Sequence, residues 1–286
     1  MSKGALIFAY NNDFDYLAMA DVAAGLVRKN LGIPTTVVTD EASIAGRKLK
    51  YIDNIVTKES VGGTTRSFML PDTTVKTVWR NLNRSDAYEL SPYDQTLMLD
   101  SDYFVFSDRL KHVFTTEHEF LCFDNVYDVT GQDTYTSDAV IGKYSLPMIW
   151  ATAVYFTKSE FSELVFEFVK VIRENYRYYS LLYNFSPKPF RNDFAFSIAL
   201  HTLCGYATDK RHFFPWAMPS LTTRASVLDY RPEQNEIVYA YPVGGKTYKQ
   251  GVSKSRDMDL HLMNKLDVTD STLLEKIQEY IDAKTI

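Results

Sequence analysis

Residues 93–102, with the sequence YDQTLMLDSD, decide the fold class. The run from Thr96 to Leu99 is short and almost entirely apolar, as expected of a strand buried inside a parallel sheet. It ends in Asp100, Ser101 and Asp102, so the turn after the strand carries two carboxylates separated by one residue. Carboxylates this close repel each other, and a divalent cation relieves the repulsion. The stretch predicts a Mg²⁺ or Mn²⁺ site, with an acidic turn that binds no metal as the alternative.

Strand-like and helix-like segments alternate on both sides of this stretch. Short apolar or β-branched runs predict strands at residues 5–10, 35–39, 54–57, 96–99, 120–123 and 151–157. Apolar residues at helical spacing predict helices at residues 14–30, 75–82, 159–185, 192–204 and 271–283. Residues 62–67 and 244–256 are expected to be loops, and the pattern beyond Phe213 weakens into short strands and loops. Such alternation is typical of a parallel sheet, which binds ligands at the carboxyl ends of its strands.

Two helices have a pattern that also predicts which face is buried. In the helix at 14–30 the predicted apolar face consists of Leu17, Ala20, Ala24 and Val27. In the helix at 159–185 it consists of Phe161, Leu164, Val165, Phe168 and Ile172. The second pattern indicates packing against the core rather than a cofactor site.

The composition is that of an ordinary globular protein. The 286 residues include 45% apolar and 23% charged residues, with a net charge of −5 and no sharp change that would mark a domain boundary. We expect one α/β domain. The mild acidity gives no general attraction to nucleic acid. The 20 Tyr and 18 Phe residues suit sugar- or base-binding walls, although core packing accounts for most of them.

The chain shows no targeting or membrane signal. No apolar run approaches the ~20 residues that a spanning helix needs, so we expect no stable membrane insertion. The short run after Lys3 is interpreted as a strand rather than as a signal peptide. Cys122 and Cys204 are the only cysteines, which is too few for a disulfide framework or a zinc cluster. A reducing, cytoplasmic location is the simplest expectation.

The motif at 93–102, Tyr-Asp-x-x-Leu-x-Leu-Asp-x-Asp followed by Tyr103–Phe106, resembles the metal-binding motif of GT-A fold glycosyltransferases. The glycogenin and lipopolysaccharide-galactosyltransferase family is the most similar, over about residues 5–205. The resemblance implies a Rossmann-like, mostly parallel sheet flanked by helices, with a smaller mixed C-terminal part. It implies a single domain over residues 1–286, with a nucleotide-binding half (1–110), a sugar and acceptor half (111–240) and a C-terminal lid loop and helix (241–286).

The same resemblance implies a reaction and its partners. A sugar would move from a nucleoside-diphosphate donor, a UDP-sugar by preference, to an acceptor hydroxyl, with Mn²⁺ or Mg²⁺ as cofactor. The metal ligands would be Asp100, Asp102 and His261, and Asp193 would be the catalytic carboxylate. The donor-binding residues would be Tyr10, Asn11, Asn12, Asp13, Tyr16, Lys76, Arg80, Ser101, Thr152, Asn192 and Lys265. The acceptor stays open among a glycan, a protein, a small molecule and a modified DNA base.

Several of these residues have a structural interpretation as well. Residues 11–13 could cap a helix, and Asn192 and Asp193 could do the same. Lys76 and Arg80 could form a solvated basic face. The strand at 151–156 lacks the Asn and Gly of the family's Asn-x-Gly-Val element. Between His261 and Lys265 the spacing is short and the family's Gly is missing.

The basic segment from Gly244 to Arg256 is expected to close over a diphosphate as a lid, or to be a solvated loop. Two other functions fit the same motif. The first is a metal-dependent nucleotidyltransferase or phosphohydrolase, which also uses carboxylates at strand ends. The second is a carbohydrate- or nucleic-acid-binding protein on a degenerate transferase fold.

Overall fold

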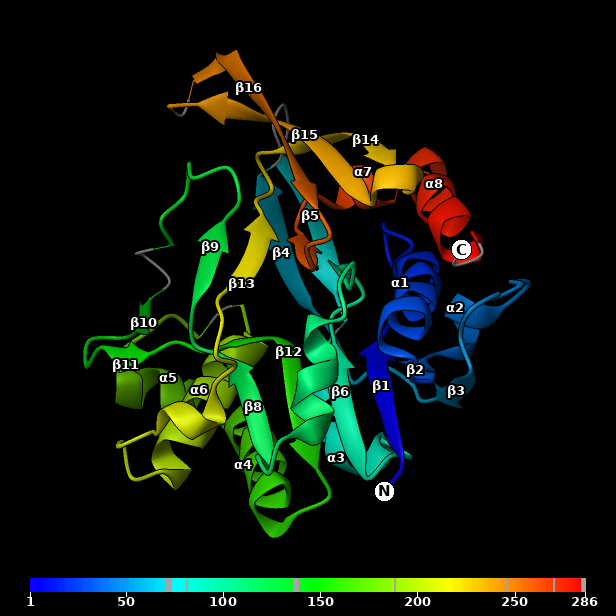
Figure 1. The fold of residues 1–286 in the computed structure, drawn as a ribbon. Coiled ribbons are helices and arrows are strands. Elements are labelled where there is room, and N and C mark those ends of the chain that lie inside the picture. Colours follow the sequence, from blue (N-terminus) through cyan, green and yellow to red (C-terminus); the bar gives the residue numbers. More distant parts are fainter. Residues whose placement is uncertain are drawn as a thin grey trace.

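The computed structural model describes residues 1–69, 74–80, 82–135, 139–187, 189–244, 246–269 and 271–283. A six-stranded sheet in the order β3-β2-β1-β6-β12-β8 forms its centre (Figure 1). The first four strands are parallel, and β12 runs antiparallel to β6 and β8. Their bounds are β1 Lys3–Phe8, β2 Thr35–Thr39, β3 Asn54–Thr57, β6 Gln95–Leu99, β8 Phe120–Phe123 and β12 Trp150–Thr157. The predicted α/β class with a mostly parallel central sheet is confirmed.

The central strands are buried along their whole length. Every residue of β2 and β6 is buried, and β1 is buried from Gly4 onward. A parallel strand with both faces covered needs a continuous apolar or β-branched sequence. For this reason these runs could be recognised as strands from the sequence. The polar residues Asp100 and Asp102 come directly after β6, where the chain leaves the sheet.

Helix α1 (Tyr16–Leu31) follows β1 and has the predicted buried face. Leu17, Ala20, Ala24 and Val27 are all fully buried. The Asp15 carboxylate caps its first turn by accepting the Ala18 N–H at 3.1 Å. Helix α8 (Ser271–Asp282) packs against α1 as a second layer, and Tyr280 donates a hydrogen bond to the Asn30 side chain at 3.2 Å. The predicted C-terminal helix is therefore confirmed.

The predicted helix at 159–185 is two helices. Helix α4 (Glu160–Glu174) ends at Asn175, where α5 (Tyr176–Tyr183) begins. The buried face of α4 is shifted from the predicted one, since Leu164 is 48% exposed whereas Phe166 and Val169 are fully buried. The contact with α6 (Asn192–Leu203), which itself packs on β12, explains the shift because it covers the side that carries Phe166. None of the helices within the described residues is long and apolar enough to cross a bilayer.

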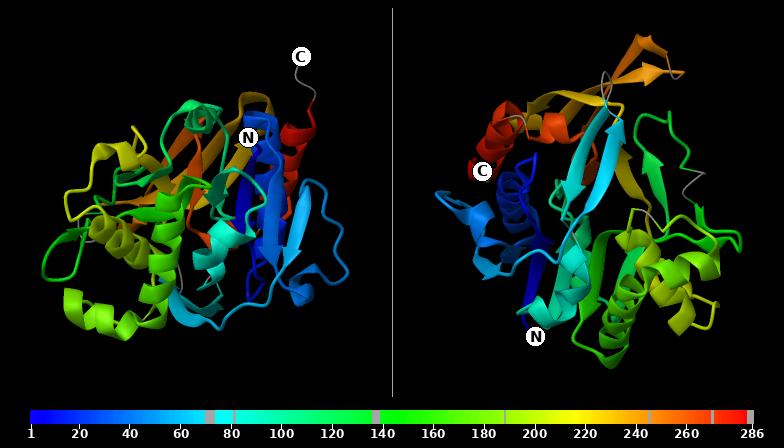
Figure 2. Two further views of the ribbon diagram at one scale, coloured as in Figure 1. Left: turned by 90° about the horizontal axis from the view of Figure 1, so that it is seen from below. Right: turned by 180° about the vertical axis from the view of Figure 1, so that it is seen from behind.

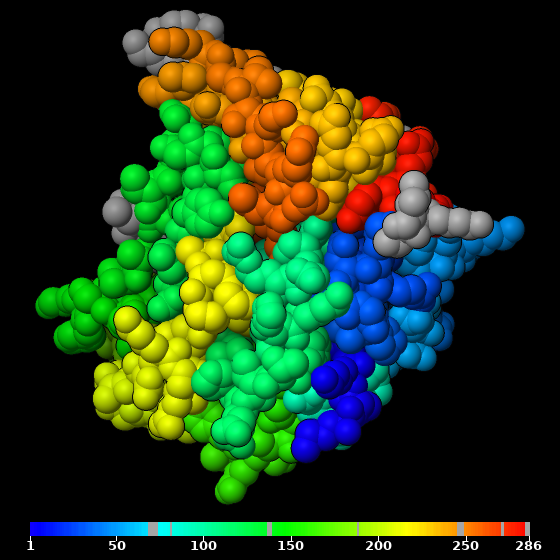
Figure 3. Space-filling view, viewed as in Figure 1, coloured from blue at the N-terminus to red at the C-terminus, as the bar shows by residue number. Residues whose placement is uncertain are grey.

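Smaller sheets surround the central one. A four-stranded sheet has the order β7-β17-β13-β9, and an antiparallel three-stranded sheet has the order β14-β15-β16. The latter forms one end of the molecule (Figure 3). The bounds are β7 Tyr103–Phe104, β9 Val126–Asp128, β13 Met218–Leu221, β14 Ser226–Arg231, β15 Glu236–Val243, β16 Lys246–Arg256 and β17 Leu260–Leu262. The remaining short elements are α2 Glu41–Ile44, α3 Ala87–Leu90, β10 Val140–Ile141, β11 Leu146–Pro147, α7 Lys265–Val268, η1 Leu82–Asp86, η2 Arg109–Thr115, η4 Lys210–His212 and η5 Pro232–Gln234.

Three local predictions were wrong. The segment 62–67, expected as a loop, enters strand β4 (Thr64–Met69) at Thr64. The segment 244–256, expected as a loop, is mostly strand β16, which pairs with β15 from Glu236 to Val243. The segment 75–82, expected as a helix, contains β5 (Thr74–Trp79), which forms a hairpin with β4 (Figure 2). In β5 the β-branched residues Thr74, Val75, Thr77 and Val78 favour a strand, and pairing with β4 decides the outcome.

Buried His201 on α6 predicts how stability changes with pH. Its Nε2 lies 2.9 Å from the Pro147 carbonyl oxygen, and burial lowers the pKa of the imidazole. The unfolded chain therefore takes up a proton as the pH falls through about 6.5, while the folded chain resists it. Stability should be complete above that pH and decline below it. His201→Gln should reduce the decline in melting temperature between about pH 7.5 and pH 5.5. An unchanged decline, measured by circular dichroism, would contradict this assignment.

Candidate functional site

A cleft with a volume of about 150 Å³ lies at the carboxyl end of β6. This is the place where open parallel sheets bind ligands. The cleft brings together eleven of the residues selected from the sequence. They are Tyr10, Tyr16, Arg80, Asp100, Ser101, Asp102, Thr152, Asn192, Asp193, His261 and Lys265.

Four of the selected residues do not line the cleft. Asn11 and Asn12 shape the start of α1, where their side-chain oxygens accept the N–H groups of Leu17 at 2.9 Å and Phe14 at 2.8 Å. The side chains of Asp13 and Lys76 are exposed. The structural interpretation therefore fits the asparagines better than donor binding does.

The neighbouring strand β12 fixes the turn that carries the two aspartates. The Asp100 N–H donates to the Thr152 carbonyl at 2.8 Å, and the Tyr103 N–H donates to the Asp100 carbonyl at 3.1 Å. The buried strand β6 thus delivers Asp100 at the edge of the cleft, and the tight turn directs Asp102 into its buried part. The Asp102 side chain is only 8% exposed, against 23% for Asp100.

His261 reaches the aspartates through strand pairing. Strand β17 pairs with β7, which places His261 opposite Tyr103, and the Leu262 N–H donates to the Asp102 carbonyl at 2.9 Å. The His261 Nε2 lies 3.4 Å from an Asp102 carboxylate oxygen. One ligand atom from each of Asp100, Asp102 and His261 lies within 4.8 Å of the others. These three side chains could therefore hold a metal ion.

The chemistry of these donors fits a divalent cation. Burial lowers the pKa of His261, which keeps the imidazole neutral and able to ligate. Its Nδ1 is buried, and no hydrogen-bond partner for it exists among the described residues. Two carboxylates with one imidazole are a donor set that suits Mn²⁺ or Mg²⁺.

Lys265, at the start of α7, already places a positive charge beside these donors. Its ammonium contacts the Asp102 carboxylate, and the side chain is 8% exposed. Burial lowers the pKa of Lys265, whereas the negative charge of Asp100 acts in the opposite direction. The Asp102 carboxylate therefore has both the His261 imidazole and the Lys265 ammonium as neighbours.

Sequence reasoning missed Arg84. This residue lies on η1, 16 positions before Asp100, and its guanidinium is 2.5 Å from the Asp100 carboxylate. It also contacts the Ala151 carbonyl on β12 and is almost completely buried. A polar run at 83–86 just ahead of the buried strand was the available signal, but the false helix at 75–82 directed attention to Lys76 and Arg80.

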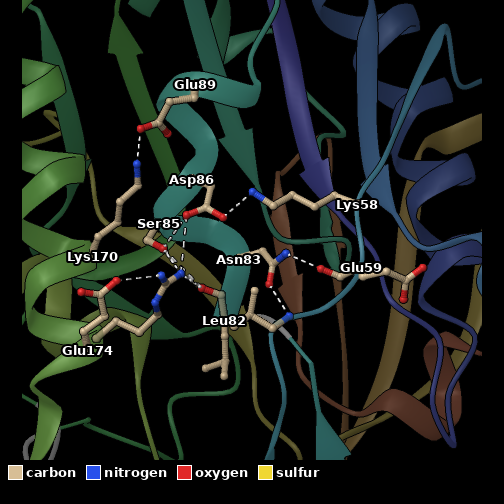
Figure 4. A network of polar contacts seen from close by, with 11 residues as sticks. Lys58, Glu59, Leu82, Asn83, Ser85, Asp86, Glu89, Lys170 and Glu174 are labelled. Carbon is tan, nitrogen blue, oxygen red and sulfur yellow. Dashed lines mark hydrogen bonds and ion pairs between the residues drawn. The ribbon is translucent and has the colours of Figure 1, made fainter.

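A polar network holds η1, and with it Arg84, in place (Figure 4). The Asn83 side chain accepts the Val61 N–H at 2.8 Å and donates to the Glu59 carbonyl at 2.9 Å. Asp86 pairs with Lys58 at 2.7 Å and with Arg173 of α4 at 3.5 Å. Because these buried polar groups are satisfied by two separate segments, residues 58–61 and helix α4, the position of η1 is strongly specified.

Asp193 lies in the first turn of α6 rather than at its N-cap, which is Arg191. One carboxylate oxygen accepts the Ala151 N–H at 3.0 Å, and the other lies 3.4 Å from the Arg191 guanidinium. The capping interpretation of Asp193 is therefore wrong. The contact with β12 instead fixes the carboxylate on the wall of the cleft.

Comparisons with known proteins show a distant likeness only. No model of a protein family matches the sequence, and no curated protein matches it. Glycosyltransferase GlyE of Streptococcus pneumoniae TIGR4 matches 74% of this chain at 15% identity with a TM-score of 0.38, and the chain spans 45% of its length. The galactosyltransferase LgtC, solved with donor and acceptor sugar analogues, matches 70% of each chain at 17% identity with a TM-score of 0.42.

Mouse xyloside xylosyltransferase 1 matches 75% of this chain and 84% of its own at 11% identity, with a TM-score of 0.44. Because all three TM-scores lie below 0.5, the function has to be inferred from the side chains of this chain.

Proposed function

We propose that the protein is a metal-dependent glycosyltransferase that uses a nucleoside-diphosphate sugar, with a UDP-sugar favoured. One observation carries the proposal: Asp100, Asp102 and His261 share a cleft with the basic side chains of Arg80, Arg84 and Lys265. Carboxylates and an imidazole suit a divalent cation, and guanidinium and ammonium groups suit phosphate oxygens. A diphosphate bound to a metal needs both kinds of group in one place.

Different residues of the cleft contribute to breaking the bond between sugar and diphosphate. When bound, a divalent cation supplies Lewis-acid stabilisation of the negative charge on the leaving diphosphate. Arg84 and Lys265 add fixed positive charge on the same side, and burial strengthens their effect because little water screens them. Arg80, which is more exposed, contacts the outer phosphate oxygens.

Asp193 is the proposed catalytic carboxylate. As the bond to the diphosphate breaks, positive charge develops on the sugar, and a fixed carboxylate stabilises it. The Ala151 N–H holds Asp193 in one orientation, which limits the reorganisation needed during the reaction. Tyr10, Tyr16, Thr152 and Asn192 line the same cleft and are proposed to contact the nucleoside and the sugar.

The cleft has to widen for this substrate. Its volume of about 150 Å³ is below the roughly 300–1,000 Å³ that is usual for ligand sites. Trp79 and Arg80, at the end of β5, form part of its wall, so the β4–β5 hairpin is the element proposed to move. The two strands of this hairpin are visible in the right-hand view of Figure 2.

A thermal-shift screen of UDP-, GDP-, ADP- and CDP-sugars with and without Mn²⁺ tests the proposal. The expected result is a rise in melting temperature for one nucleotide class that is larger with Mn²⁺ than without it, since a ligand that binds only the folded state stabilises it. The alternative nucleotidyltransferase would release inorganic pyrophosphate from a nucleoside triphosphate. Stabilisation by none of these sugars would contradict the proposed function.

A further inference from the structure

Arg66, on β4, has an environment unlike those of the other basic residues in the cleft. Its guanidinium stacks on the Trp79 ring at 3.5 Å and donates to the Phe190 carbonyl at 2.8 Å. Its Nε is buried, and the described part of the chain offers it no hydrogen-bond acceptor. Burial lowers the pKa of Arg66 to about 10, so the group remains positively charged at neutral pH.

The other basic groups of the cleft have a carboxylate nearby. Arg84 pairs with Asp100, Lys265 with Asp102, and Arg191 with Asp193. Arg80 lies 3.9 Å from Asp40. Within the described residues, no carboxylate lies within ion-pair distance of Arg66. A charged group that is largely removed from water without a counter-ion is costly, and a ligand that supplies the counter-ion recovers that cost.

Arg66 lies on the side of the cleft that is proposed to hold the sugar. Its hydrogen-bond acceptor, Phe190, directly precedes Arg191, and the charges that act most strongly on its pKa are those of Asp193 and Arg191. The basic residues that contact the carboxylates of the metal site are different ones, Arg84 and Lys265. Asp100 and Lys265 also act on Arg66 electrostatically. Within the described residues, however, the side-chain hydrogen bond of Arg66 goes to Phe190 and no ion pair joins it to the metal site. An anion on Arg66 is therefore expected on the Phe190 side of the cleft, apart from the diphosphate.

We propose that the cleft binds a substrate with an anionic group beyond the diphosphate, a carboxylate or a phosphate on the sugar side, and that Arg66 is its partner. The inference rests on the proposed function and specifies its substrate class. Stacking on Trp79 holds the guanidinium plane, and the Nε–H and the remaining Nη groups are the donors that a planar oxyanion needs. The anion belongs either to the transferred sugar or to the acceptor.

Calorimetric binding to wild-type protein and to Arg66→Met distinguishes the two sources, in the presence of Mn²⁺. In the donor arm the probes are UDP-glucuronate and UDP-glucose, which differ by a carboxylate in place of a hydroxymethyl group. In the acceptor arm they are glucose 6-phosphate and glucose, added to the UDP-bound protein. We expect the wild type to bind the anionic member of one pair at least about tenfold more tightly and Arg66→Met to bind both members equally.

Two control variants separate this role from a structural one. Arg66→Lys keeps the charge and should retain part of the preference, and exposed Arg211→Met should leave it unchanged. UDP affinity should persist in Arg66→Met because Arg84 and Lys265 hold the diphosphate. No preference in either arm, or a preference that survives in Arg66→Met, overturns the inference while UDP binding still supports the proposed function. If the wild type binds none of the UDP compounds, the proposed function fails and the inference fails with it.

Discussion

Asp102→Asn should lower the rate of sugar transfer by at least about a thousandfold, since charge stabilisation at a reacting centre is commonly worth that much. The substitution keeps the shape of the side chain but removes the negative charge that faces both His261 and Lys265. The metal site loses a ligand, and the ammonium loses its counter-ion. Initial rates of nucleoside-diphosphate release at saturating donor measure the effect.

Binding of Mn²⁺, followed by electron paramagnetic resonance, should weaken in Asp102→Asn in the same titration series. Asp124→Asn is a suitable control because Asp124 is exposed and lies outside the cleft. It should have the wild-type rate and the wild-type metal affinity. If Asp102→Asn has the wild-type rate and the wild-type Mn²⁺ affinity, Asp102 has no role in metal binding or in sugar transfer.

Arg84→Met should reduce both activity and stability. Transfer should slow by about a hundredfold or more because a buried positive charge beside the diphosphate is lost. The free energy of unfolding should fall by about 2 kcal/mol, less than the roughly 3–5 kcal/mol of a fully buried pair, because the partner Asp100 is 23% exposed. Urea unfolding measures the second effect, and Arg211→Met, an exposed arginine, is the matched control.

The double variant Arg84→Met/Asp100→Asn separates the pair from the rest of the network. If the cost arises from leaving Asp100 without its guanidinium, the double variant should be more stable than Arg84→Met alone. If the double variant and Arg84→Met are equally stable, the loss of unfolding free energy arises instead from the lost contact between Arg84 and the Ala151 carbonyl. An unchanged rate in Arg84→Met would contradict its proposed role at the diphosphate.

The parts of the fold that could be predicted are those in which local sequence and burial agree. Strands β1, β2 and β6 are buried on both faces, so their apolar runs are distinctive. Helix α1 shows the same agreement in its four fully buried stripe residues. Strands β5 and β16 are partly exposed and carry Lys76, Lys249 and Lys254, so their local pattern is weak and pairing with β4 and β15 decides their structure.

The candidate site shows the same division. Asp100 and Asp102 follow a buried strand and could be located from the ten residues 93–102, whereas the approach of His261 depends on the pairing of β17 with β7. The resemblance to a glycosyltransferase motif pointed to His261, and the structure supplies the reason for its position. Arg66 had no such signal and Arg84 had only the polar run at 83–86, because strand pairing and a buried polar network bring them to the cleft.

Metal-dependent release of a nucleoside diphosphate tests the central claim most directly. The wild-type protein is incubated with the nucleotide sugar chosen by the thermal-shift screen, with water as the acceptor of the sugar, first with Mn²⁺ and then with excess chelator. We predict release of the nucleoside diphosphate that stops on chelation, resumes when Mn²⁺ is restored, and is lost in Asp102→Asn. Release at the same rate in the chelated protein, or an Asp102→Asn protein as active as the wild type, would contradict the account.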